Sequence, residues 1–326
     1  MHLRFLAPAA LLLATACSST TVVDGASACD GAIGVAPTVV AGGLDDAVDL
    51  VDVGDELLLT TSSVVSRVDP CTGAATVIAN DEDIVASAVA GDDVYFVTTD
   101  IMGVLSWLHR VPLAGGEVED LGDIETRRIA GATQGLYALA SDEGAYRIID
   151  VTDGPGGTQL ELDGADYGRR YALHGATEAG LFLRDSYDAG GPLPMRRWAY
   201  GAEKTAAVPG SEGAIFVDVD PAGFTIYRES SATGGGIIRL PHGGGEPEVI
   251  LEGAALRGQG EVRVLAGSRD AVCWRGLDTG PRCLSLGRAT EPRVVDDTRA
   301  GPMVLRDALF WLREGSAGTE LMAAVP

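Results

Sequence analysis

Residues 88–123, AVAGDDVYFVTTDIMGVLSWLHRVPLAGGEVEDLGD, contain the pattern from which the architecture of the whole chain follows. A short strand and an Asp-Asp turn lead into an apolar strand over Val94–Thr98. A loop, a second strand over Trp107–Leu113, an Ala-Gly-Gly turn and a closing strand complete the stretch. These residues therefore predict three to four short antiparallel strands.

Similar units recur along the chain at intervals of 37 to 48 residues. In most units a turn pair precedes the second strand, and a third strand, a Gly-rich turn and a fourth strand follow it. Four strands in about 40 residues is the period of propeller blades, and no helical period persists beyond a turn or so. The seven second strands are expected to begin at Leu57, Val94, Leu136, Leu181, Phe224, Val272 and Leu309.

The two ends of the chain support the same interpretation. The seventh unit stops after its third strand, Thr319–Val325, whereas a spare strand, Ala36–Gly42, precedes the first unit. An N-terminal strand that completes the last blade would close the ring and remove an exposed sheet edge. We therefore expect an all-β, seven-bladed β-propeller of four-stranded antiparallel blades; one miscounted unit would make it six or eight.

The first residues carry an export signal. The apolar run Leu6–Ala14 is too short to span a bilayer, which needs about 20 residues. The segment Leu13–Cys17 resembles the lipobox of bacterial lipoproteins, with Ala14 where Leu is usual. The resemblance implies cleavage before Cys17, its lipidation, and stable anchoring by several acyl chains; the alternative is an ordinary signal with a chance cysteine. In a Gram-negative host, Ser18 would favour the outer membrane.

These features divide the chain into a lipoprotein signal peptide (1–16), a lipidated Cys with a flexible tether (17–34) and a propeller (35–326). The net charge of -23, from 24 Lys and Arg against 47 Asp and Glu, disfavours nucleic acid and electrostatic membrane binding. Solubility is the simplest explanation of this acidity.

Four cysteines remain after Cys17, an even number in an oxidising compartment, with three alternative pairings. Cys273 and Cys283 flank one hairpin, where facing strand positions come within disulfide reach. Cys29 then pairs with Cys71 and staples the tether onto the first repeat. A metal site is disfavoured because the chain has no C-x-x-C and its four histidines are far apart.

The phrases Arg67–Gly73 (RVDPCTG) and Arg110–Gly116 (RVPLAGG) resemble repeats of secreted bacterial propellers of the YWTD, TolB and quinoprotein-like groups. This resemblance covers residues 36–326 loosely. A true YWTD motif and the tryptophan-docking motifs of quinoproteins are absent. Propellers of these groups host binding, scaffolding and enzymatic functions alike, so the resemblance implies a fold and no single activity.

Motifs for zinc proteases, serine hydrolases, phosphate loops and EF-hands are absent. In a propeller, however, the first strands of all blades converge on one channel. Asp52, His174, Asp218 and Asp220 are the candidate site for a small ligand or cation at a channel mouth; the alternative is turn or surface residues satisfied by neighbours or water. Other ionisable residues near these strands are Asp49, Arg127, Arg128, Arg263 and Arg306.

The sequence therefore favours an extracytoplasmic, lipid-anchored binding or scaffolding propeller with an envelope protein or polysaccharide as partner. No cofactor, metal or catalytic residue is expected. This hypothesis predicts blade-top loops with exposed apolar or charged side chains. The alternatives are a hydrolase-like or lyase-like enzyme at the channel mouth, in which His174 meets acidic first-strand residues, and a purely structural surface protein.

Overall fold

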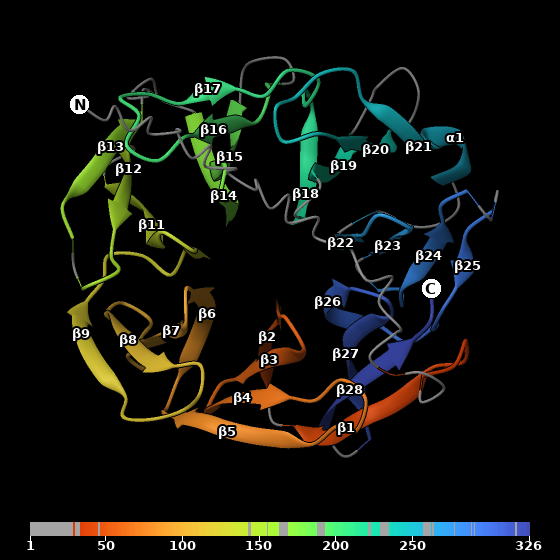
Figure 1. Cartoon of the computed structure of the whole chain (residues 1–326), viewed down its shortest axis with the longest axis horizontal. Coiled ribbons are helices and arrows are strands. Elements are labelled where there is room, and N and C mark those ends of the chain that lie inside the picture. The colour runs from red at the N-terminus through yellow and green to blue at the C-terminus, as the bar shows by residue number, and fades with distance from the viewer. Residues whose placement is uncertain are drawn as a thin grey trace, which may run out of the picture.

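The computed structural model describes residues 29, 33–44, 46–142, 145–154, 156–162, 169–187, 193–220, 223–228, 235–256, 262, 264–276, 278–287, 289, 291–316 and 318–326. Seven four-stranded antiparallel sheets form a ring (Figure 1), so the predicted seven-bladed propeller is confirmed. The predicted signal peptide, Cys17 and most of the predicted tether lie outside the described residues. The one described helix, α1 (Gly253–Leu256), has four residues.

Each blade is numbered here by the order of its innermost strand in the chain. The innermost strands are β2 (Ala47–Val53), β6 (Ile84–Ala90), β10 (Ile129–Ala132), β14 (Arg169–Thr177), β18 (Ala214–Asp220), β22 (Val264–Gly267) and β26 (Ala300–Leu305). The second strands are β3 (Glu56–Thr61), β7 (Asp93–Thr99), β11 (Gly135–Asp142), β15 (Gly180–Tyr187), β19 (Gly223–Arg228), β23 (Ala271–Arg275) and β27 (Leu309–Gly315).

The third strands are β4 (Val64–Val68), β8 (Ser106–Pro112), β12 (Ala145–Asp150), β16 (Arg196–Trp198), β20 (Gly236–Leu240), β24 (Arg282–Ser285) and β28 (Gly318–Ala324). The outermost strands are β5 (Ala75–Asn80), β9 (Glu119–Asp123), β13 (Thr158–Leu162), β17 (Ala206–Ala207), β21 (Glu248–Glu252), β25 (Arg293–Val294) and β1 (Thr38–Leu44). The predicted second strands all begin within or at the start of the observed ones.

Blade 7 is closed by the N-terminal strand, as the sequence predicted. β1 pairs antiparallel with β28, with Thr38 opposite Ala323 and Ala41 opposite Leu321. The strand runs over Thr38–Leu44 instead of the expected Ala36–Gly42 because it follows β28 as far as Thr319. This pairing hydrogen-bonds the open edge of β28 and joins the two ends of the chain.

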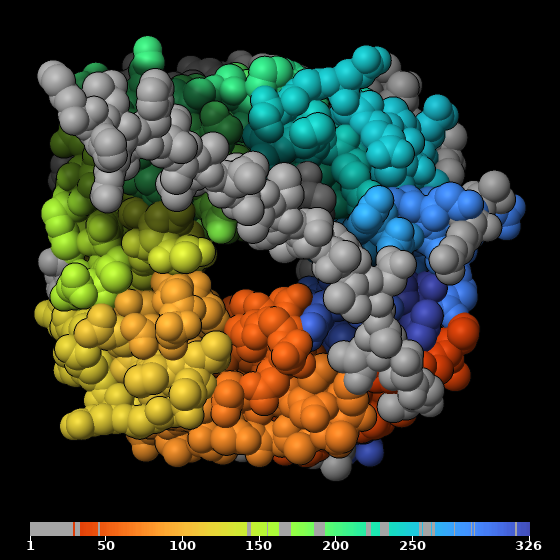
Figure 2. Space-filling model, in the orientation of Figure 1, coloured from red at the N-terminus to blue at the C-terminus, as the bar shows by residue number. Residues whose placement is uncertain are grey.

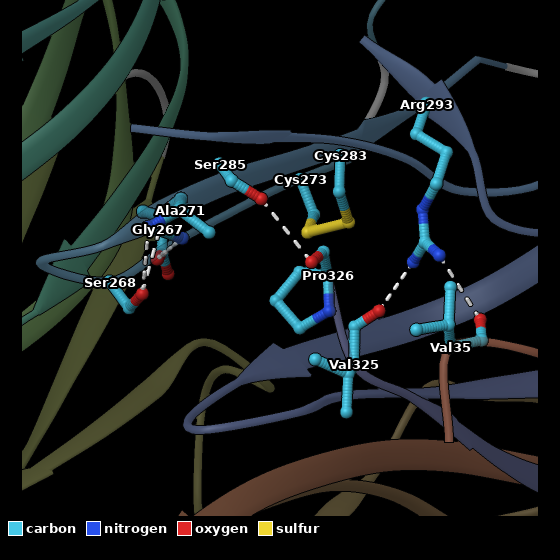
Figure 3. Close-up of a disulfide and its surroundings, with 11 residues drawn as sticks. Val35, Gly267, Ser268, Ala271, Cys273, Cys283, Ser285, Arg293, Val325 and Pro326 are labelled. Carbon is cyan, nitrogen blue, oxygen red and sulfur yellow. Dashed lines mark hydrogen bonds between the residues drawn. A yellow bond between two sulfur atoms is a disulfide. The ribbon is translucent and has the colours of Figure 1, made fainter. Parts of the chain in front are cut away.

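Blade 6 holds both of these terminal segments in place (Figure 3). The guanidinium of Arg293 on β25 donates to the carbonyls of Val35 and Val325, and Ser285 Oγ donates to the carbonyl of Pro326 at 3.3 Å. Val325 N–H in turn donates to the carbonyl of Gly34 at 2.9 Å. One arginine therefore stabilises the ring where its ends meet.

The core lies between neighbouring blades. Each hydrophobic cluster contains side chains from two adjacent sheets, such as Leu57 of blade 1 with Phe310 of blade 7. Trp198, Trp274 and Trp311 are fully buried in such clusters, whereas Trp107 is half-buried on β8. Since each blade packs only on its neighbours, a long chain forms one domain without one oversized core.

Glycine allows neighbouring blades to approach each other closely beside the channel. A Cβ at Gly131 of β10 would lie 1.8 Å from the carbonyl oxygen of Val89 on β6, and one at Gly267 of β22 would lie 2.0 Å from Thr225 Oγ1. Both distances are far inside van der Waals contact. At these two positions the blades approach too closely for any side chain.

Both predicted disulfides are confirmed. Cys29 is bonded to Cys71 and Cys273 to Cys283, and the second pair occupies directly opposite positions on β23 and β24 (Figure 3). No helix in the described part of the chain is long and apolar enough to cross a membrane.

Candidate functional site

The two faces of the ring are defined by the direction of the innermost strands. We name the face where these strands begin the start face, and the face where they end the end face. The start face carries the hairpins between second and third strands and the connections between blades. The end face carries the turns between first and second strands.

The central channel is open in the space-filling view (Figure 2) and holds a cavity of about 860 Å³. Its walls are the middle and end-face portions of all seven innermost strands. Most of these residues are Ala, Gly, Val, Leu or Ile, with a few polar groups between them, which is the usual composition of a small-molecule site. The polar lining residues with ionisable side chains are Asp49, Asp52, Asp92, His174 and Asp218.

A buried hydrogen-bonded chain links blades 1 and 2 at the channel wall. Thr60 Oγ1 donates to Ser87 Oγ at 2.8 Å, Ser87 Oγ donates to Asp49 Oδ2 at 3.4 Å, and Leu50 N–H donates to Asp49 Oδ1 at 2.9 Å. Burial raises the pKa of Asp49 despite these donors. These hydrogen bonds supply donors to the carboxyl of Asp49 and fix β2 against β6.

Asp52 lies at the end-face rim of the channel and is partly exposed. Its Oδ2 is 3.4 Å from Arg306 Nε on blade 7, and its Oδ1 accepts the N–H of Gly54 at 3.1 Å. Partial burial raises the pKa of Asp52, while Arg306 acts in the opposite direction. Asp52 therefore takes part in an ion pair between blades 1 and 7.

His174 stands on an irregularity of its strand. The register between β14 and β15 shifts between Leu173 and Gly175, which makes His174 the extra residue of a β-bulge. Such bulges redirect a side chain, and His174 lines the channel. Its Nε2 is buried without a hydrogen-bond partner, and burial, with a smaller contribution from Arg184, lowers its pKa to about 4. The imidazole is therefore neutral at pH 7.

Asp218 of β18 also lines the channel, where its Oδ2 accepts the N–H of Gly267 at 2.7 Å from blade 6. Asp220 ends the same strand, and its side chain lies outside the described part of the structure, as does Arg263. Among the described residues, no group of three or more His, Cys, Asp or Glu side chains is placed to hold a metal ion.

Three of the four predicted site residues, Asp52, His174 and Asp218, therefore line one channel. Asp52 forms an ion pair with Arg306 and accepts a hydrogen bond from Gly54, and the carboxyl of Asp218 accepts a hydrogen bond from the amide of Gly267. Arg127 and Arg128 line a different, smaller pocket on the start face. The channel provides a lined cavity with one unsatisfied imidazole nitrogen, and any role in binding or catalysis stays a prediction.

The neutral state of His174 predicts a pH dependence of stability. An unfolded histidine has a pKa of about 6.5, so at pH 5 it binds a proton that the folded state, with a pKa of about 4, does not bind. The contribution of His174 to the free energy of unfolding is retained at pH values above 6.5 and is lost as the pH falls toward 4. Between pH 7.5 and pH 5.0 it decreases by about 2 kcal/mol.

Urea unfolding followed by tryptophan fluorescence at these two pH values measures this effect. In His174→Gln, the difference between the two pH values should be smaller than in the wild type by that amount. The raised pKa of Asp49 and Asp52 acts in the opposite direction but is common to both proteins. An identical pH difference in wild type and variant would contradict a neutral buried His174.

A second feature, the apolar loop Ile101–Leu105 between β7 and β8 on the start face, was not predicted from the sequence. Ile101 is 93%, Met102 78%, Val104 75% and Leu105 55% exposed. The largest exposed apolar side chains of the described residues are thus gathered on one hairpin tip. A possible signal was the run Ile-Met-Gly-Val-Leu at a position where turn residues are expected.

The apolar loop is held in one conformation. The carboxyl of Asp100 accepts the N–H groups of Val104 at 2.6 Å and Leu105 at 3.0 Å, and its backbone N–H donates to the carbonyl of Leu105 at 3.1 Å. Gly103 adopts a positive φ of 65°, and the guanidinium of Arg127 donates to its carbonyl. The loop backbone is therefore preorganised, and binding need order only the four side chains.

Both acidic and basic residues lie near this loop. Glu82 and Asp83 are exposed in the connection that precedes β6. This connection lies near the loop, because the carbonyl of Asp83 accepts the N–H of Thr99 at 3.1 Å. Glu125, close to Arg127 in the chain, is paired with Arg147. Arg127, which contacts the carbonyl of Gly103 in the loop, and Arg128 are exposed as well, so the apolar tip has a margin of mixed charge.

Comparisons with known proteins agree on the fold alone. No protein-family model and no curated protein matches the chain. Among solved structures, the β-propeller domain of the Trilobed protease from Pyrococcus furiosus, which has an open velcro topology, matches with TM-score 0.58 and 11% identity over 86% of this chain and 95% of that one. In this chain, by contrast, β1 closes blade 7.

Two further structures are similar. Acylaminoacyl peptidase from Pyrococcus horikoshii matches with TM-score 0.56 and 15% identity, over 85% of this chain and 50% of that one. The computationally designed Ika8 protein matches with TM-score 0.52 and 11% identity, over 89% of this chain and 99% of that one. At these identities the matches identify a β-propeller and no activity.

Proposed function

We propose that the chain is an exported, lipid-anchored binding module whose apolar loop, Ile101–Leu105, docks into an apolar cleft of a partner protein in the bacterial envelope. The observation that carries the proposal is the exposure of four large apolar side chains on one ordered hairpin tip. Soluble proteins rarely expose such a group without a binding role.

Export and anchoring rest on the lipobox-like segment that ends at Cys17. Two disulfides in the described part of the chain suit an oxidising compartment. Cys17 is proposed to hold the protein at the outer membrane, on its periplasmic or surface side.

A protein is favoured as the occupant over an anionic lipid surface because the chain as a whole is strongly acidic. Glu82 and Asp83 and the net charge of -23 repel an anionic lipid surface, and they favour a cleft with basic residues at its margin. A preformed apolar tip that enters such a cleft resembles the buried anchor residues at the centre of protein interfaces.

Site-specific crosslinking tests the proposal in cells that express the full-length protein. A photo-crosslinking amino acid is placed at Met102 and, as a control, at Val249 on β21, which is 52% exposed on another blade. We expect a discrete protein adduct from position 102 and none from position 249. The captured partner is then purified and its affinity for the propeller is measured.

Met102→Ser should weaken that affinity at least tenfold, because it truncates an anchor residue that becomes fully buried on binding, whereas Val249→Ser should leave it unchanged. A propeller without its acyl chains that binds phospholipid vesicles through the loop would overturn the proposal in favour of a membrane surface. Equal adducts from both positions, or none from position 102, would also overturn it.

An enzyme that acts on a small molecule or sugar at the channel mouth is the second candidate function. One observation favours it, the unpartnered Nε2 of a neutral imidazole in the channel wall. A neutral imidazole accepts a proton, as a general base must, although a pKa of about 4 makes it a weak one at pH 7. Loss of a detected hydrolase or lyase activity in His174→Gln would support this role.

A further inference from the structure

A second large cavity, of about 870 Å³, opens on the start face between blades 6, 7 and 1. Its walls are the end of β23, the start of β26, the hairpin between β27 and β28, and the start of β2. It shares no lining residue with the central channel. We refer to it as the arginine pocket because Arg275, Arg299 and Arg313 line it.

One of these arginines is neutralised within the protein. Arg313 Nη2 lies 2.6 Å from Glu320 Oε2, and its Nη1 lies 3.1 Å from Asp296 Oδ2. Both carboxylates therefore hold Arg313 in a fixed position on β27. This ion-pair network raises the pKa of Arg313 and leaves it with little capacity to bind a further anion.

The other two arginines have no such compensation. Arg275 is half-buried and donates through Nε to the carbonyl of Gly301 at 2.9 Å and through Nη1 to that of Gly276 at 3.0 Å. Within the described ranges, no carboxylate forms an ion pair with Arg275 or with the exposed Arg299. Burial, and in second place the charge of Arg299, lower the pKa of Arg275.

An internal structural role explains only part of this arrangement. The hydrogen bonds of Arg275 to the carbonyls of Gly276 and Gly301 give this residue a structural role, because they join blade 6 to the start of β26. They do not account for Arg299, whose charge repels that of Arg275 in a chain with 47 acidic residues and 24 basic ones. Two adjacent guanidinium groups are stabilised when an anion binds between them.

We propose that the arginine pocket binds a small molecule through a carboxylate or phosphate group held by Arg275 and Arg299. The planar guanidinium presents paired N–H donors that match these oxyanions. Asp46 and Glu314 also line the pocket and repel a bare anion, but they accept hydrogen bonds from hydroxyl or ammonium groups. The ligand class is therefore an acid that also carries such donors, for example a sugar acid.

The volume of the pocket supports this class. Small-molecule sites commonly enclose about 300–1,000 Å³, so the pocket has room for a sugar acid with its hydration water. This site is independent of the apolar loop, and the two proposals can fail separately.

Isothermal titration of the full-length protein with D-galacturonate, inorganic phosphate and neutral D-galactose tests the inference at constant ionic strength. We expect at least one of the two anions to bind to the wild type and D-galactose not to bind. Arg299→Gln, which removes an exposed side chain without a described protein contact, should weaken the anion affinity at least tenfold.

Arg269→Gln is the matched control, since it makes the same charge change at an exposed position on the end face, between β22 and β23. It should change the affinity less than twofold. Binding of neither anion, equal binding of D-galactose, or equal losses in the two variants would overturn the assignment.

Discussion

Leu321→Ala is expected to lower the free energy of unfolding by about 2–5 kcal/mol, the range for removing a fully buried leucine side chain. Leu321 lies on β28 with no exposed surface, opposite Ala41 of β1 and Leu312 of β27. It packs in the cluster between blades 7 and 1. The substitution therefore leaves a cavity at the place where the ring closes.

Urea unfolding at pH 7.5 measures this change, with Val39→Ala as the control. Val39 lies on β1 itself but is 47% exposed, so its truncation should alter the stability by no more than about 0.5 kcal/mol. If both variants were as stable as the wild type, the contact between β1 and β28 would not belong to the cooperative unit, and the description of closure would be wrong.

Removal of the disulfide between Cys29 and Cys71 should cost about 4 kcal/mol in the chain-entropy model. The bond closes a segment with a sequence separation of 42 that contains β1, β2, β3 and β4. In the unfolded chain it keeps the closing strand near blade 1, and this restriction is lost when the bond is absent.

Cys29→Ser, Cys71→Ser and the double variant should all lose the same amount, since each one abolishes the same bond. Unfolding in urea without reductant measures all three, and a free thiol assay confirms that no other pairing forms. A loss below about 1 kcal/mol would show that the residues before β1 unfold separately from the propeller.

Much of the fold was predictable because it depends on local patterns. The apolar strand, turn and strand of residues 88–123 set the period, and the same pattern marks every blade. Closure followed from a count of strands at the two ends, Ala36–Gly42 and Thr319–Val325. The pairing of Cys273 with Cys283 followed from their facing positions across one hairpin, which left Cys29 for Cys71.

The candidate site was predictable only in outline. Asp52, His174 and Asp218 line the channel because innermost strands converge in any propeller. The bulge that redirects His174 has no sequence signature, since it is one extra residue in the pairing of β14 with β15. The ion pair of Asp52 with Arg306 joins residues that are far apart in the chain, so no spacing indicated it.

Repeat period, strand order and disulfide pairing were predictable from the sequence alone, since each depends on neighbours in the chain or on a count along it, whereas the structure settled the blade number at seven. Only the tertiary structure decided which side chains meet across blades and which stay exposed. Arg275 and Arg299 come together, and Ile101–Leu105 stays uncovered, because ring closure places seven separate sheets side by side. Contacts between blades depend on that arrangement, which no local pattern of residues encodes.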